Sequence, residues 1–406
     1  MCKVFVTDLF FMTSFHILGQ WPKRVLLPFF FSVVILLAQS VLAVPLSAHL
    51  ENSLQKSLRQ EQGPLDAGYG GIDPKSWACL QQVYQAFSGN LLWVDREGLT
   101  DRAWALLRVL HESSSHGLSP SRYHVAEILE LLPSKKIENL VQLELLLTQG
   151  FVRYVQDMSV GILPRRGDSK RAIEDHLKER LDALPIVNKA IASERFVDYL
   201  EQLPPDHSYY RRLQHALVRY RNIEASGGWP NIPEGALLRP GDSDPRIRAV
   251  KLRLLKTDFL KGQQSSMPDD FYDDALRQAV CHFQRHHGIL PDGVLGARTI
   301  AAMNIPVARY IEILRLNLFR WHGLAHKLGE RYVLVNIATC TLAAVDDAQV
   351  VLTMPVVVGK QNTQTPMFSD WVRYLVFNPY WTITPNIAKT EELAGLRKNP
   401  NHLVSR

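Results

Sequence analysis

The thiols carry the most reactive chemistry in this sequence, because a cysteine thiolate can attack a carbonyl carbon or bind a metal ion. They are scattered, and no two of them form a Cys-x-x-Cys pair; the four are Cys2, Cys79, Cys281 and Cys340. This spacing argues against a disulfide framework or a zinc ribbon. Cys340 is the only thiol in a strand-rich stretch, and no histidine stands near it in the sequence to act as a base. We therefore expect it to pack rather than react, and Cys281, on the flank of a helical seam, has the same interpretation.

Histidines could bind a metal or act as bases, and two groups raise that question. His111 and His116 stand five positions apart, which would place their side chains about 140° apart around a helix instead of on one face. His286 and His287 are adjacent and would point in different directions. We expect His111 and His116 to be surface residues near a helix end. The sequence predicts neither a metal site nor a cofactor.

The composition favours a folded protein with several domains. The 406 residues are 46% hydrophobic and 21% charged, which supports roughly two to four domains and excludes a disordered chain. The net charge is +6, and residues 306–406 hold 11 basic against 7 acidic residues, a surplus of four. Because the basic residues form no run, this surplus argues against nucleic acid as a partner and favours an acidic polymer such as peptidoglycan.

The N-terminal segment has the pattern of an export signal. Lys23 and Arg24 precede the apolar run Val25–Ala38, and Val41–Ala43 offers the small residues that a signal peptidase needs. We assign residues 1–43 to a signal peptide or a signal anchor. The chain is then exported to the periplasm, and an uncleaved leader would attach it to the inner membrane.

Residues 50–225 have helical periodicity, with apolar residues at three- and four-residue spacing between turns rich in Gly and Pro. The predicted helices are residues 74–87, 100–113 and 137–158. The segment from Gly227 to Pro233, GGWPNIP, marks a boundary. The pattern predicts an α-helical scaffold domain over residues 50–225.

Residues 241–305 predict three short helices around one small core. Their apolar seams are Ile247, Val250 and Leu254, then Phe271, Ala275, Leu276, Ala279, Val280 and Phe283, then Ile300 and Met303. An ordered set of residues in this stretch resembles the signature of the three-helix peptidoglycan-binding module of wall enzymes: Phe283, Gln284, Gly288, Asp292, Gly293, Gly296 and Thr299. The resemblance implies peptidoglycan as the partner. It does not tell which side chains touch glycan, and most of the signature also serves turns and packing.

After a linker helix in residues 306–330, the period changes to that of strands, in residues 331–345, 349–360 and 370–378. The runs RYVLVNI (331–337), VVVGK (356–360), TP (365–366) and FNPYWTITPNI (377–387) resemble the catalytic domain of the peptidoglycan L,D-transpeptidases. Together with HGLSPSRY (116–123) and YRRLQHALVRYRNI (210–223), they resemble the large, scaffold-containing, YcbB-like subclass. The expected fold is multidomain α+β, and we expect residues 331–406 to be an incomplete catalytic domain.

The resemblance implies acyl transfer between stem peptides through a cysteine thioester, which forms 3-3 cross-links. The family nucleophile lies in a Ser-(Ser or His)-Gly-Cys-Val-Arg stretch, downstream of the Asn-Pro-Tyr-Trp segment and with a histidine upstream of the cysteine. No cysteine here follows a glycine, so we predict no catalytic residue in this chain and place the motif beyond Arg406. Three hypotheses stay open: a truncated L,D-transpeptidase that is inactive alone, a non-catalytic peptidoglycan-binding scaffold protein, and a wall hydrolase. The hydrolase would need a zinc constellation, which the sequence lacks. The oligomeric state is not predicted.

Overall fold

The computed structural model describes residues 2–7, 46–59, 74–161, 183–260, 268–324, 328–360, 364–378, 383, 385–401 and 403. The predicted leader falls mostly outside these ranges. Its described part is strand β1 (Cys2–Thr7), which pairs with two strands of the C-terminal sheet. Within the described part of the chain, no helix is long and apolar enough to cross a bilayer.

The N-terminal helices pack around one long helix, α5 (Ile137–Ser159), which is buried along most of its length. Helices α1, α2, α3, α4 and α7 all contact it. Helix α3 begins where the Thr100 hydroxyl accepts a hydrogen bond from the Ala103 amide, which satisfies one of the unpaired donors of a helix start. The other elements of this group are α1 (Leu46–Leu58), α2 (Pro74–Ala86), α3 (Asp101–Glu112), the short helices η1 (Ser113–His116) and η2 (Pro120–Tyr123), α4 (Val125–Leu131), α7 (Leu184–Ala192) and α8 (Phe196–Gln202).

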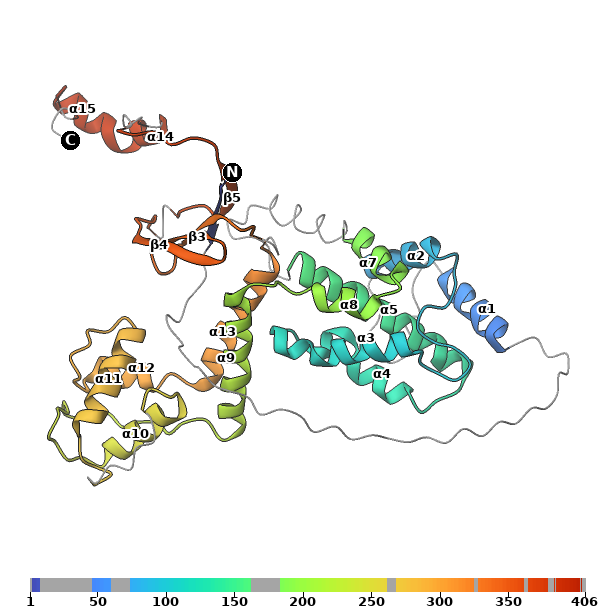
Figure 1. Cartoon of the computed structure of the whole chain (residues 1–406), viewed down its shortest axis with the longest axis horizontal. Coiled ribbons are helices and arrows are strands. Elements are labelled where there is room, and N and C mark those ends of the chain that lie inside the picture. Colours follow the sequence, from blue (N-terminus) through green and yellow to red (C-terminus); the bar gives the residue numbers. More distant parts are fainter. Residues whose placement is uncertain are drawn as a thin grey trace.

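Two helices far apart in the sequence pack against each other and join the parts of the chain. They are α9 (Ser208–Ala225) and α13 (Val307–His322), which we call the connector pair. In Figure 1 the pair runs between the N-terminal helices, the C-terminal strands and the helices α10 to α12. Its core holds large aromatic side chains, among them Tyr210, Tyr220, Tyr310 and Trp321.

Between the two connector helices, the chain folds into a three-helix unit with its own core: α10 (Arg246–Lys256), α11 (Asp274–His286) and α12 (Ala297–Met303). The predicted core of this unit is wrong at two positions: Phe271 is only half-buried, and Ala275 is exposed. Asp273 caps α11 through the Leu276 amide, so the buried stripe begins at Leu276. Tyr272 is buried in place of its neighbour Phe271.

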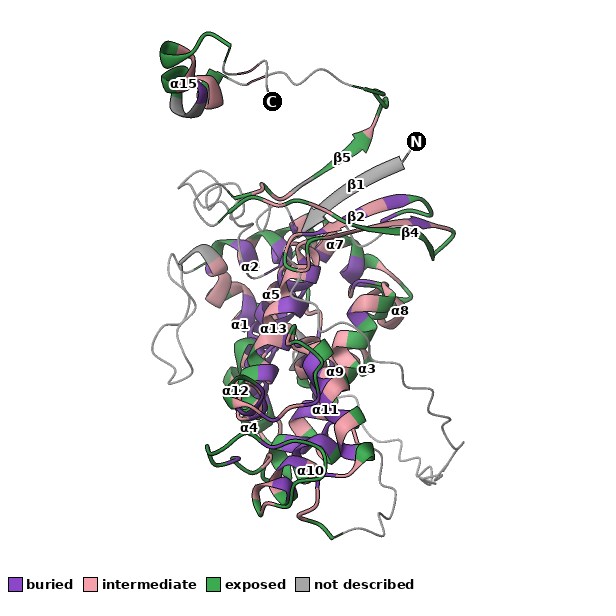
Figure 2. Ribbon diagram, turned by 90° about the vertical axis from the view of Figure 1, so that its left-hand side faces the viewer, coloured by how far each residue is buried: buried purple, intermediate pink, exposed green. Residues whose placement is uncertain are grey.

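The C-terminal strands form a sheet in the order β4-β3-β2-β1-β5. Strand β1 runs parallel to β2, and the other neighbours are antiparallel; the strands are β2 (Tyr332–Asn336), β3 (Thr341–Asp346), β4 (Gln349–Pro355) and β5 (Phe368–Val372). The predicted single run 331–345 is a hairpin with a turn after Asn336. Figure 2 shows exposed residues along β4 and β5. The chain continues into α14 (Pro385–Ile387), a π-helical turn (Ala388–Glu392) and α15 (Leu393–Lys398). The multidomain α+β prediction is confirmed.

Candidate functional site

Several signature residues of the three-helix unit meet at one buried amide, that of Gln284. Its nitrogen donates to an Asp292 carboxylate oxygen at 2.8 Å, to the Val294 carbonyl at 3.0 Å and to the Thr299 hydroxyl at 3.1 Å. Its oxygen accepts the Gly293 amide at 2.9 Å. Gln284 thereby ties the loop of residues 288–296, which follows α11, to the start of α12. We call this segment the signature loop.

Backbone geometry explains why the signature loop needs glycine. Gly293 has a φ of 71°, and a Cβ atom there would lie 2.8 Å from the Arg277 side chain. The carbonyl of Gly293 accepts the buried Tyr272 hydroxyl at 2.6 Å. Gly288 also has a positive φ, 63°, but nothing lies within 4 Å of its missing side chain. Gly293 therefore serves both conformation and close packing, whereas Gly288 serves conformation alone.

Hydrogen bonds also fix the charge state of Asp292. The Val294 amide and the Gln284 side chain donate to its carboxylate, and these bonds lower its pKa below the usual value. Phe283, Gln284 and Thr299 are all buried. The structure thus joins four of the predicted signature residues, Gln284, Asp292, Gly293 and Thr299, by hydrogen bonds that support the signature loop. Their role toward glycan stays a prediction.

The C-terminal sheet brings two sequence motifs together. The backbone amide of Gly359, in the VVVGK run, donates to the hydroxyl of Thr365, in the Thr-Pro pair, at 2.8 Å. In the RYVLVNI run, the Asn336 side chain closes the β2–β3 turn by accepting hydrogen bonds from the Ala338 and Thr339 amides. These contacts order the loops at the ends of the strands without a charged group.

The prediction that Cys340 packs in a strand is wrong. It lies in the β2–β3 turn with a φ of 52° and is exposed, because the strand run is interrupted there. Its thiol donates to the Ile337 carbonyl at 3.7 Å, and within the described part of the chain no histidine is hydrogen-bonded to it. Cys281 is half-buried beside Gly293, as the packing interpretation predicts. Cys79 is buried in the N-terminal helical core.

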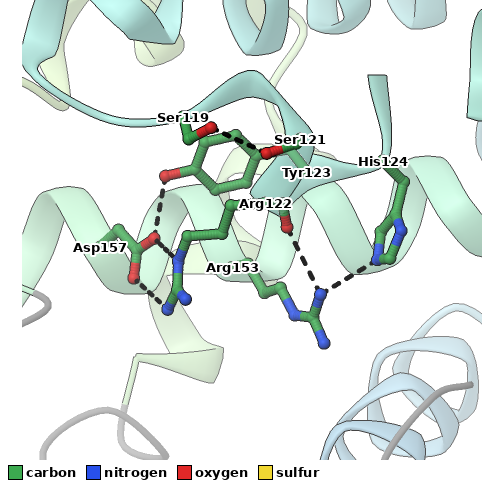
Figure 3. A network of polar contacts seen from close by, with 7 residues as sticks. All are labelled: Ser119, Ser121, Arg122, Tyr123, His124, Arg153 and Asp157. Atoms are coloured by element: carbon green, nitrogen blue, oxygen red, sulfur yellow. Dashed lines mark hydrogen bonds and ion pairs between the residues drawn. The ribbon is translucent and has the colours of Figure 1, made fainter. Parts of the chain in front are cut away.

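Residues 113–124, which we call the joint loop, connect the N-terminal helices to the connector pair. Figure 3 shows part of it: Arg122 forms a two-point ion pair with Asp157 of α5, and the Tyr123 hydroxyl donates to the same carboxylate. Hydrogen bonding to Asp157 raises the pKa of Arg122. Burial raises the pKa of Tyr123. The buried Asp157 carboxylate is therefore paired with the Arg122 cation and also accepts a hydrogen bond from the neutral Tyr123 hydroxyl.

Arginines from three helices donate to carbonyls of the joint loop. Arg221 of α9 donates to Ser114 at 2.7 Å, Arg315 of α13 to Gly117 at 2.8 Å and Arg153 of α5 to Arg122 at 3.4 Å. Figure 3 also shows Arg153 next to the His124 ring. The joint loop is consequently held from both sides, by the N-terminal helices and by the connector pair.

The prediction that His116 is a surface residue is wrong. Its Nδ1 lies 2.6 Å from the Tyr210 hydroxyl and 3.0 Å from the Gln214 amide, and the same hydroxyl lies 2.8 Å from His322 Nε2. Burial lowers the pKa of His116 to about 4. His116 is half-buried because the connector pair covers the end of α3, which periodicity cannot reveal. His111 is exposed, as predicted. The described residues contain no group of three or more side chains suited to a metal.

The periodicity of the sequence does not predict the buried charges of Glu144 and Arg253. Glu144 of α5 is fully buried and accepts the amides of Leu92, Trp93 and Val94. Arg253 of α10 is 1% exposed and donates to the Met303 carbonyl. Each interrupts an apolar stripe of its helix, and that interruption is the signal that could have identified it.

Comparisons with known proteins match the chain in three segments. A family model named scaffold domain matches residues 78–217, a peptidoglycan binding domain model matches residues 243–303, and an L,D-transpeptidase catalytic domain model matches residues 330–406. A search of curated proteins finds no match. The three models follow one another in the order expected from the sequence, and their matches coincide with the N-terminal helices, the three-helix unit and the C-terminal sheet. Together, the three matches support a YcbB-like L,D-transpeptidase.

Proposed function

We propose that this chain binds peptidoglycan through its three-helix unit and that its own thiols do not form 3-3 cross-links. In this proposal residues 1–43 are the leader, residues 50–225 the scaffold, residues 241–305 the wall-binding module and residues 306–330 the linker helix. Residues 331–406 contribute strands of the catalytic domain. Because its substrate polymer lies outside the cytoplasm, the protein acts after export.

The observation that carries the proposal is the match of residues 243–303 to a peptidoglycan binding domain. A core of its own, separate from the other two hydrophobic clusters, supports this assignment. The Gln284 amide holds the signature loop through three hydrogen bonds and ties it to Thr299 of α12 through a fourth. A ligand that contacts this loop would meet a preorganised surface and lose little free energy to its ordering.

The surroundings of the thiols support the proposal that they do not form 3-3 cross-links. Acyl transfer to an amine through a thioester needs a thiolate and a base within hydrogen-bond reach. Cys79 is buried, Cys281 is packed against the signature loop, and Cys340 bonds to a backbone carbonyl. For Cys340, no imidazole is hydrogen-bonded to the sulfur among the residues that the structure describes.

Cosedimentation of the chain with purified sacculi tests wall binding. We expect the wild-type chain to pellet with sacculi and Gln284→Met to be retained less, because the methionine fills the space but leaves the Gly293 amide without its acceptor and the Asp292 carboxylate without one donor. The loss should loosen the signature loop by about 3 kcal/mol. Gln278→Ala is the matched control, since Gln278 is exposed on the same helix and its side chain donates to Asp274 instead of to the signature loop.

Each outcome of this experiment decides something. A wild-type chain that stays in the supernatant would contradict wall binding altogether. Equal retention of wild type and Gln284→Met would place binding outside the three-helix unit. Circular dichroism of each variant, with thermal unfolding, checks that the remaining helices are folded.

A further inference from the structure

The three-helix unit and the segment before it expose several leucines: Leu252 and Leu255 on α10, and two others near the signature loop. Leu290, in the signature loop, is 74% exposed, and Leu237, in the segment before α10, is 58% exposed. Neither position is needed for the core, which is complete without them. Single exposed leucines are ordinary on protein surfaces, so the question is whether these two share one surface.

A two-stranded contact places Leu237 beside the signature loop. The Leu238 amide donates to the Leu295 carbonyl at 3.4 Å, and the Leu295 amide donates to the Leu238 carbonyl at 3.0 Å. Leu238 and Leu295 are both buried, so the alternation of an extended segment turns Leu237 outward. Its Cδ2 atom lies 3.0 Å from where a Cβ atom of Gly296 would be. Leu237 therefore covers the glycine that begins α12.

Arg298 connects this position to Leu290. It belongs to the first turn of α12, two residues after Gly296, and its guanidinium reaches back to the Gly288 carbonyl at 3.4 Å. Leu290 stands two residues after Gly288 in the chain. Arg298 thus contacts the start of the loop that carries Leu290, and it follows by two residues the glycine that Leu237 covers. Arg298 is itself exposed, and no carboxylate of the described residues forms an ion pair with it.

We infer that Leu237, Arg298 and Leu290 form the surface that contacts the stem peptide of peptidoglycan. This inference rests on the proposed function and assigns its contact residues. Stem peptides carry free carboxylates and small apolar side chains, and a guanidinium between two leucines is complementary to both. An arginine can bind a carboxylate with two parallel hydrogen bonds, while the leucines lose exposed apolar area on contact. Asp292 is the anionic side chain of the loop, and its carboxylate is already engaged by Gln284 and the Val294 amide.

Sacculus cosedimentation with surface variants of the full chain tests the assignment. We expect Leu237→Ser and Leu290→Ser each to weaken retention about fivefold, in proportion to the apolar area that each leucine would bury. Arg298→Gln should weaken it to a similar extent and reduce the dependence of binding on salt, since the guanidinium no longer pairs with a carboxylate. Arg298→Lys should restore part of the salt dependence.

Leu252→Ser is the matched control, because Leu252 is 51% exposed on α10 of the same unit but not part of this surface. It should leave retention unchanged. If the wild-type chain fails to bind sacculi, the proposed function is wrong. If the wild type binds and the Leu237, Leu290 and Arg298 variants bind equally well, wall binding stands and this surface is wrong. Thermal unfolding of each variant separates a lost contact from a lost fold.

Discussion

The guanidinium carbon of Arg253 lies 3.7 Å from the centroid of the Trp229 ring. Arg253 belongs to the three-helix unit, and Trp229 belongs to the segment that leaves α9, where its ring packs against Tyr220 and Tyr310 of the connector pair. The indole nitrogen also donates to the Ile305 carbonyl at 3.1 Å. The segment that the sequence suggests as a simple boundary is therefore a packed joint between the wall-binding unit and the connector pair.

Arg253→Met should destabilise this joint by about 3 kcal/mol, because it removes a desolvated cation–π contact and the donor to the Met303 carbonyl. The measurement is chemical denaturation of the full chain, combined with proteolysis of residues 226–245. Arg248→Met is the control, because Arg248 lies exposed on the same helix. Equal stability and equal cleavage of the two variants would show that Arg253 does not hold the joint.

Gly117→Ala tests the contact between the joint loop and α13. Gly117 has a φ of 80°, and a Cβ atom there would lie 3.2 Å from Leu318 Cδ1 and 3.3 Å from the Arg315 Cα atom. We expect a loss of about 2 kcal/mol, of which about 1 kcal/mol is backbone strain. Gly241→Ala provides the comparison, because Gly241 has a φ of 95° with nothing within 4 Å. A loss no greater than that of Gly241→Ala would mean that α13 tolerates the added methyl group.

His116 should make stability depend on pH in the acid range. Its pKa in the folded chain is lowered to about 4 by burial, against 6.5 for an exposed histidine. The unfolded chain then binds more protons, so the stabilisation is complete above pH 6.5 and is lost as the pH falls towards 4. The full effect is about 3 kcal/mol. His116→Gln should flatten the pH dependence of the unfolding free energy, whereas His111→Gln, at an exposed site on α3, should not. Parallel curves for wild type and His116→Gln would contradict this.

Glu144 should make the stability of the folded chain fall, and not rise, as the pH increases, which is opposite to the effect of His116. Burial raises its pKa to about 7 despite hydrogen bonds from the Leu92, Trp93 and Val94 amides and from Tyr84. A raised pKa stabilises the folded chain below pH 4.5, and this contribution of about 3 kcal/mol is lost as the pH rises from 4.5 through 7. Glu144→Gln should remove this slope. It should also cost about 2 kcal/mol, because an amide nitrogen cannot accept the backbone amides that the carboxylate accepts. Urea unfolding from pH 4.5 to 8 checks both effects.

Helices α2, α3 and α5 follow from the sequence to within about two residues, because long amphipathic segments with clear ends carry a strong signal. The signature of the three-helix unit likewise identifies Gln284 and Thr299, although not their mutual hydrogen bond. Contacts between distant segments carry no such signal. His116 is half-buried by helices 94 or more positions away in the chain, and Cys340 leaves the strand because a hairpin turn interrupts an apolar run. Periodicity reports which face of an element is apolar, not which partner covers it.

The 406-residue chain should form no 3-3 cross-links. Incubation with muropeptides that carry tetrapeptide stems, followed by chromatography of the products, measures this directly, and mass spectrometry after carbapenem treatment detects any acylated thiol. We expect neither product, because Cys340 is exposed but its sulfur contacts the Ile337 carbonyl instead of a base, whereas Cys79 is buried and Cys281 half-buried. Cys340→Ser should consequently change nothing. Cross-links, or a carbapenem adduct that disappears in Cys340→Ser, would contradict the prediction and identify Cys340 as a nucleophile. An adduct that persists in Cys340→Ser would also contradict it and would point to another thiol of the chain.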